Sequence, residues 1–190
     1  MNAKWKHSES MNVPVGHCNS IFHIFLSHWP SRSFYHENSS TRHYLGLRLR
    51  DSIDEIIEKE KSNPHIILIG DFNDEPFNKS LSEHLMATRD KNLVRKHKHL
   101  LYNPSWNYLG YKNFESDQIC GTYYYKSGRI TKWHTFDQII FSHAFINSQE
   151  WKLKESNYNI LAITDIVDSI MNSKQIFDHL PVIAEIEKVI

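Results

Sequence analysis

The apolar positions in the first half of the chain predict a strand, a helix and a second strand. Residues 21–26 and 65–70 are short apolar runs typical of strands, and the second run predicts a strand buried on both faces. From the N-cap candidates at 39–41 to about residue 61, apolar residues recur every three or four positions, as on a helix with one buried face. The arginines of this helix are expected to face away from the core: Arg42, Arg48 and Arg50.

The second half of the chain shows shorter and less regular patterns. Residues 87–118 mix charged residues, Asn and Gly without a period, which predicts long surface loops with at most one helical turn. Residues 1–19 have no strand pattern, so we predict an irregular lead-in there and a folded domain at 20–190. The other predicted elements are a short helix at 77–86, a hairpin from 121–125 to about Trp133, strands at 136–142, 150–160 and 182–186, and a helical turn within 164–175.

Composition limits the protein to one globular domain without a strong electrostatic field. The chain has 190 residues, of which 40% are hydrophobic, and its 22 Lys and Arg balance 22 Asp and Glu. Any polyanion would therefore need a local basic patch. Cys18 and Cys120 fix no disulfide framework and are interpreted as free thiols. No apolar stretch is long enough to span a membrane, and residues 1–17 lack the apolar core of a signal peptide, so the compartment stays open.

The strand at 65–70 leads directly into a pair of oxygen-bearing side chains. Gly70 is expected to end the strand in a sharp turn, and Asp71 and Asn73 follow two positions apart. In an extended backbone such side chains point the same way, and hard oxygen ligands suit Mg²⁺ or Mn²⁺ with the phosphate it holds. The alternative is an Asp/Asn turn that caps the next helix.

Polar groups also stand at the ends of the other predicted strands. His28 follows the first strand and precedes Arg32, which suggests an acid/base or phosphate-contacting pair or, alternatively, an ordinary surface loop. Asp137 opens an otherwise apolar strand, where a carboxylate is either solvated or tied to a partner. Asp178 and His179 precede the last strand and, as neighbours in extended chain, point to opposite sides.

Four of these signals, taken in order, resemble the endonuclease/exonuclease/phosphatase family. They are His28–Arg32, with the sequence His-Trp-Pro-Ser-Arg, Gly70–Asp74, Phe136–Ile139 and Asp178–Val182. The family includes pancreatic deoxyribonuclease, apurinic endonucleases, neutral sphingomyelinases and inositol-polyphosphate 5-phosphatases. The resemblance is strongest to the bacterial nuclease-like branch and covers about residues 20–188.

The resemblance implies a fold and a metal site. The fold is a four-layer α/β sandwich of the deoxyribonuclease I-like type, here lacking the N-terminal strands. The implied cofactor is Mg²⁺ (or Mn²⁺), held by Asp71, Asn73 and Asp178. The implied partner is nucleic acid or another phosphate-ester substrate.

The resemblance also implies catalytic roles. His179, hydrogen-bonded to Asp137, is implied as the acid/base residue acting with a metal-activated water. His28 is implied to stabilise or protonate the phosphate beside Asp71 and Asn73. Arg32, together with Asn73, is implied to contact the substrate phosphate.

One part of the family pattern is missing. Family members carry an Asn and a metal-binding Glu in an N-terminal half, and nothing in residues 1–20 has that form. We therefore expect a truncated chain that hydrolyses phosphodiesters weakly unless an N-terminal segment complements it. The leading interpretation is a metal-dependent nuclease; the alternatives are a phosphatase or sphingomyelinase-like phosphodiesterase, and a non-catalytic remnant or interaction module.

Overall fold

A mixed six-stranded sheet forms the centre of the protein. The computed structural model describes residues 8–15, 20–60, 63–110, 119–147, 150–171 and 177–189. The strands of the sheet lie in the order β1, β2, β3, β8, β5, β4, with β2 and β3 parallel and β8 antiparallel to β3. Their bounds are β1 Ser8–Val15, β2 Ser20–His28, β3 His65–Asp71, β4 Ala87–Thr88, β5 Leu101–Tyr102 and β8 Asp137–Ser142.

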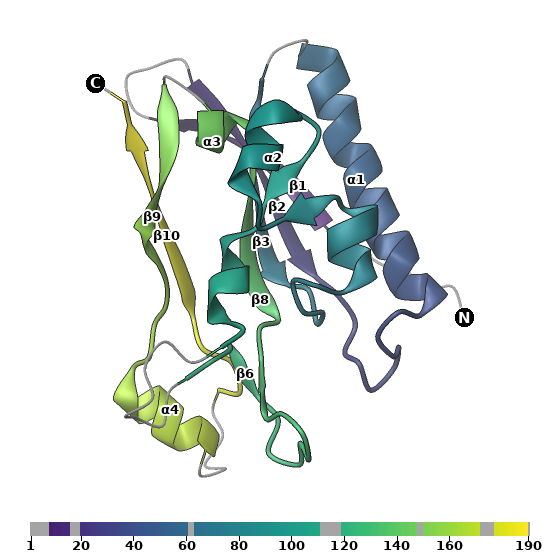
Figure 1. Ribbon diagram of the computed structural model, residues 1–190, viewed down its shortest axis with the longest axis vertical. Helices are drawn as coiled ribbons and strands as arrows, with labels where there is room; N and C mark the ends of the chain where they lie inside the picture. Colours follow the sequence, from purple (N-terminus) through teal and green to yellow (C-terminus); the bar gives the residue numbers. More distant parts are fainter. Residues whose placement is uncertain are drawn as a thin grey trace.

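Both faces of this sheet are covered by other elements. Helix α1 (Ser40–Glu60) lies along one face, and the antiparallel ribbon of β9 (Trp151–Ile160) and β10 (Val182–Lys188) lies on the other (Figure 1). The described residues thus form three of the four layers of the predicted sandwich. None of their helices is both long and apolar enough to cross a membrane. The remaining elements are η1 Ser80–His84, α2 Lys91–Lys96, η2 Pro104–Tyr108, β6 Tyr123–Tyr124, β7 Trp133–His134, α3 Ala144–Asn147 and α4 Thr164–Met171.

Two apolar cores result from this layering. The first lies between α1 and the sheet and includes Leu49, Ile53 and Ile66. The second lies between the sheet and the β9–β10 ribbon and includes Phe141 and Tyr158. Strand β3 contributes to both, Ile66 to the first and Ile67 to the second, as expected for a strand buried on both faces.

The prediction of an irregular lead-in is wrong for residues 8–15. These residues form β1, which pairs antiparallel with β2 from Ser8 opposite Ser27 to Val15 opposite Ser20. This strand forms by backbone pairing with the edge of β2, which does not require a run of apolar residues. The hydrophobic pattern therefore did not reveal it. The rest of the predicted lead-in, including Cys18, lies outside the described residues.

The prediction of surface loops over residues 87–118 is also wrong where the structure describes them. This segment supplies β4, α2, β5 and η2, and Leu101 and Tyr102 of β5 are buried in the two cores. Two-residue strands are too short to show a period, so their positions depend on pairing with β8 and with each other. Residues 111–118 lie outside the described residues.

Gly70 has a different role from the predicted one. It lies within β3, and a Cβ atom at this position would meet the backbone oxygen of Ser27 on β2 at 1.8 Å. The glycine therefore allows close approach of two parallel strands. The chain turns only after Asp71, which is the last residue of β3.

A buried histidine makes the stability of the fold dependent on pH. His65 packs between Phe22 and Phe145, and its Nε2 has no hydrogen-bond partner among the described residues. Burial lowers the pKa of His65 and outweighs the opposing effect of Glu150. The neutral ring is therefore favoured in the folded state, and its contribution is complete only above the unfolded pKa of about 6.5.

We expect the free energy of unfolding to fall as the pH drops from 7.5 towards the lowered pKa of His65, by at most about 1.4 kcal/mol per pH unit from this residue. In the His65→Phe variant that slope should be smaller, whereas His97→Phe on the exposed end of α2 should keep it. Urea unfolding of the three proteins over this pH range measures the difference. An unchanged slope in His65→Phe would contradict the prediction.

Candidate active site

The sheet register places three of the predicted site residues in one row. His28 on β2 is the register partner of Asp71 on β3, and Asp71 is the partner of Asp137 on β8. Register partners on adjacent strands lie about 5 Å apart with side chains on the same face. The His28 Nε2 atom lies 3.7 Å from Asp71 Oδ2. Residues from three distant parts of the sequence therefore meet at one end of the central sheet.

His179 joins this row from outside the sheet. It forms a β-bridge with Tyr123, and its Nδ1 atom donates to Asp137 Oδ2 over 2.7 Å. The backbone around Asp137 is itself held, because the buried hydroxyl of Thr122 accepts from the Phe136 and Asp137 amides. The contact between His179 and Asp137 that the family resemblance implies is thus present in the structure.

Asp71 and Asn73 meet in a turn and not in an extended backbone. Asn73 adopts a left-handed conformation with φ of 50°. Its backbone amide donates to Asp71 Oδ1 and its side-chain nitrogen to Asp71 Oδ2, both over 2.8 Å. The same nitrogen also donates to the carbonyl of Trp29. The premise of extended backbone was therefore wrong: the local geometry is an Asp/Asn turn, although the next helical segment begins only at Ser80.

The carboxylates of the row influence each other and His179. Burial raises the pKa of Asp71, and the charge of Asp137 raises it further, against the opposing effects of His179 and His28. Burial by itself lowers the pKa of His179. The hydrogen bond and charge of Asp137, with the charges of Asp71 and Asp178, outweigh burial, so the pKa of His179 is raised above its usual value. The site therefore holds excess negative charge that favours a bound cation.

The row opens into a pocket of about 790 Å³. Asp178 contributes to its lining as an exposed side chain, but it is outside the group of potential ligand atoms that lie within 4.8 Å of one another. Among the described residues, that group consists of Asp71, Asp137 and His179. The predicted metal ligands Asn73 and Asp178 stay predictions. All of the predicted site residues line the pocket: His28, Arg32, Asp71, Asn73, Asp137, Asp178 and His179.

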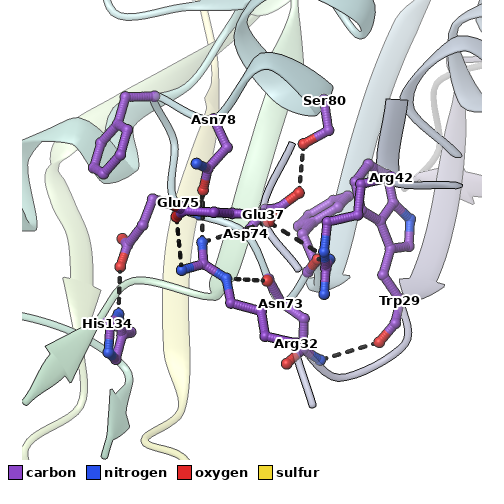
Figure 2. A network of polar contacts seen from close by, with 12 residues as sticks. Trp29, Arg32, Glu37, Arg42, Asn73, Asp74, Glu75, Asn78, Ser80 and His134 are labelled. Carbon is purple, nitrogen blue, oxygen red and sulfur yellow. Dashed lines mark hydrogen bonds and ion pairs between the residues drawn. The ribbon is translucent and has the colours of Figure 1, made fainter. Parts of the chain in front are cut away.

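The guanidinium of Arg32 is engaged by the protein itself (Figure 2). Its Nε donates to the carbonyl of Asn73 over 2.9 Å and its Nη2 to Asn78 Oδ1 over 2.6 Å. Nη1 lies 3.3 Å from Glu37, and the group stacks 4.7 Å from the centre of the Phe136 ring. These contacts hold the turn at Asn73 against the start of β8. The predicted phosphate contact of Arg32 stays a prediction.

A buried ion pair lies next to the turn at Asn73. Asp74 and Arg42 are both 0% exposed, and Arg42 Nη1 lies 3.5 Å from Asp74 Oδ1. Arg42 also donates to the carbonyls of Pro30 and Tyr35, and Asp74 accepts from the hydroxyl of Ser80. The prediction that the helix arginines face away from the core was wrong for Arg42 and for Arg50, which are both buried, and it holds for Arg48. The charge of Arg42 is tolerated because Asp74 and backbone oxygens compensate it.

The sequence analysis also missed a second carboxylate–imidazole pair. Glu75 Oε1 lies 2.8 Å from His134 Nδ1, and His134 lines the pocket. The only signal in the sequence was the position of Glu75 directly after Asp74 in the Gly70–Asp74 motif. His134 lies 59 residues away and carries no local pattern.

The comparison with family models gives one match. The endonuclease/exonuclease/phosphatase family model matches residues 4–174. The match begins ahead of the domain boundary predicted at residue 20 and ends before Asp178 and His179. No curated protein matches the chain.

Two solved structures are similar to the chain at low sequence identity. The human Nocturnin catalytic domain with bound sulfate anion is 16% identical, with a TM-score of 0.55, and the match covers 94% of this chain and 52% of that one. A mannosyl-6-phosphatase from Bacteroides thetaiotaomicron is 17% identical, with a TM-score of 0.45, covering 88% of this chain and 51% of that one. The chain spans about half the length of these structures. The likeness to Nocturnin confirms the deoxyribonuclease I-like α/β fold.

Proposed function

Since the chain belongs to the endonuclease/exonuclease/phosphatase family, we propose that its pocket hydrolyses phosphodiester bonds in a metal-dependent reaction, with nucleic acid as the substrate. Members of this family hydrolyse phosphate esters, and they include both nucleases and phosphatases. The observation that supports catalysis most directly is the hydrogen bond from His179 to Asp137 in register with Asp71 and His28.

In this proposal His179 transfers a proton during hydrolysis. Asp137 accepts from Nδ1, which leaves Nε2 as the nitrogen that takes or gives a proton in the pocket. Asp137 also stabilises the imidazolium form of the ring. His28, whose side chain is 81% exposed beside Asp71, donates to a non-bridging phosphate oxygen or to the leaving oxygen.

The residues of the site fit a divalent cation such as Mg²⁺ or Mn²⁺. Asp71 and Asp137 are directly opposed carboxylates, an unfavourable arrangement that a cation relieves. We assign Asp71, Asn73 and Asp178 as the residues that hold the ion, because Asp137 is engaged with His179. When bound, the ion neutralises charge on the phosphoryl oxygens and lowers the pKa of bound water.

Exposed aromatic side chains in the pocket favour a nucleic-acid substrate. Tyr125 is 48% exposed and Phe177 is 57% exposed, and both line the pocket. Aromatic rings that are open to solvent beside a phosphate site can stack bases without sequence preference. A phosphomonoester without a base or another ring offers these side chains no stacking partner.

We expect the purified chain to cleave a fluorescent single-stranded oligonucleotide and a p-nitrophenyl phosphodiester with added Mg²⁺ or Mn²⁺, and to lose this activity in EDTA. The assay uses enzyme at micromolar concentration, so that slow turnover is also detected. Preference for p-nitrophenyl phosphate, a monoester, would favour the phosphatase alternative. A folded chain with no EDTA-sensitive hydrolysis of any of these substrates would contradict the proposal.

A further inference from the structure

Glu75 is a buried carboxylate whose contacts serve to orient one side chain. It is 6% exposed, and its Oε1 lies 2.8 Å from His134 Nδ1 (Figure 2). Its Oε2 accepts from the Thr135 amide over 3.0 Å. A buried carboxylate is costly unless hydrogen-bonded, and here the partners are consecutive residues of one strand end. The pair fixes the orientation of the imidazole, because Nδ1 must carry the proton that Glu75 accepts.

The ring of His134 is held at the pocket wall. It stacks on Phe136 with ring centres 4.9 Å apart and planes at 21°. The side chain is 15% exposed, and it lines the same pocket as His179. Nε2 has no hydrogen-bond partner among the described residues, so this nitrogen is left for a ligand.

Strand pairing sets the distance between the two imidazoles. Tyr123 is the antiparallel partner of His134 on β7, and it also forms an antiparallel bridge with His179. Partners in antiparallel pairs have side chains on the same face, so His134 and His179 flank Tyr123 on one face. Two strand spacings separate their backbones by about 10 Å. A phosphate bound at His134 would therefore be a different one from the phosphate at His179.

The two ends of the pocket differ in charge. The end at His179 carries the carboxylates Asp71, Asp137 and Asp178. At the other end the carboxylate of Glu75 is buried behind His134 and is outside the lining of the pocket. The guanidinium of Arg32 lies 4.7 Å from the centre of the Phe136 ring on which His134 stacks, and it also pairs with Glu37 and Asp74, neither of which lines the pocket. Without a cation, an anionic group is better accommodated at the His134 end.

We propose that His134, oriented by Glu75, binds a second phosphate of the substrate, next to the one that is hydrolysed. In this arrangement Nε2 contacts a phosphate oxygen while Nδ1 donates to Glu75. The inference rests on the proposed function and narrows it. The preferred substrate carries neighbouring phosphates, as an oligonucleotide does, and His134 acts on binding and not on the chemical step.

The test compares two substrates that differ only in a second phosphate. These are thymidine 5′-(p-nitrophenyl phosphate) and the same compound with a 3′-phosphate, each assayed with Mn²⁺. For the wild type, kcat/KM should be higher with the 3′-phosphate. In His134→Ala, kcat/KM for the substrate with the 3′-phosphate should fall about tenfold because KM rises. For the substrate without the 3′-phosphate, kcat/KM should stay at the wild-type value. Glu75→Gln should shift KM in the same direction, and the exposed His97→Ala serves as the matched control.

Equal losses by His134→Ala on both substrates, or no loss on either, would overturn the inference. If the wild type hydrolyses neither substrate, the proposed function fails. The inference about His134 is then tested by measuring phosphate binding without hydrolysis. In EDTA, the NMR signals of the His134 ring should saturate at lower concentrations of thymidine 3′,5′-bisphosphate than of thymidine 5′-phosphate. Equal affinities, or no shift of these signals, would again overturn it.

Discussion

Replacing His179 with alanine is expected to lower the rate of metal-dependent phosphodiester hydrolysis by about 10²- to 10⁴-fold, the usual contribution of a general acid or base. The imidazole is the group that can move a proton beside Asp71 and Asp137, and its Nδ1 is already committed to Asp137 over 2.7 Å. Alanine removes both the proton-transferring nitrogen and this hydrogen bond. Single-turnover kinetics with the p-nitrophenyl phosphodiester and saturating Mn²⁺ measure the chemical step.

The Asp137→Asn variant keeps the imidazole of His179 and changes only the group that orients it. An asparagine amide facing Nδ1 can donate to it, which would favour the wrong tautomer, so we expect a large loss of rate with a folded protein. His97→Ala, on the exposed end of α2, should keep the wild-type rate. The catalytic assignment fails if His179→Ala keeps a rate within a factor of about 10 of the wild type, below the usual effect of such a group.

Replacing Arg42 with methionine is expected to lower the free energy of unfolding by about 3–5 kcal/mol, because it breaks a buried ion pair. Arg42 is 0% exposed, and it pairs with Asp74 and donates to the backbone carbonyls of Pro30 and Tyr35 in the loop that follows β2. Methionine fills part of the volume but leaves Asp74 with less compensation in the core. Urea unfolding followed by circular dichroism gives the free energy.

Arg48→Met is the matched control on the same helix. Arg48 is exposed and pairs with the exposed Asp51 one turn away, so its loss should change the free energy of unfolding by about 0.5 kcal/mol or less. If Arg42→Met were no less stable than Arg48→Met, the pair with Asp74 would contribute nothing to the fold. Asp74→Asn in the Arg42→Met background should recover part of the loss, because it removes a buried charge that has kept only Arg32 as an ion-pair partner among the described residues.

Several elements of the fold could be predicted because their patterns are local. Strand β3 and helix α1 follow from an apolar run and from a three- and four-residue period, and the structure confirms both. The positions of His28, Asp71 and Asp137 at strand ends were equally visible. Their meeting in one row depended on strand order and register, which the family resemblance could imply but the residues alone could not.

Strands β1, β4 and β5 could not be predicted from the sequence, because they depend on tertiary structure. Each is defined by the edge with which it pairs, and two of them have only two residues. The turn at Asn73 is an intermediate case. The sequence offered an Asp/Asn turn as one of two alternatives, whereas the hydrogen bond from Asn73 to the carbonyl of Trp29, 44 residues away, exists only in the folded chain.

The sequence by itself determined that α1, β3 and β8 enter the core and which strand ends carry oxygen and imidazole groups, because both follow from the spacing of neighbouring residues. Only the tertiary structure decided that Arg42 is buried against Asp74 and that Glu75 orients His134. A buried charge is tolerated when a partner compensates it, and these partners lie 32 and 59 positions apart in the chain. No local pattern records such a pairing, since its free energy depends on packing that exists only in the folded protein.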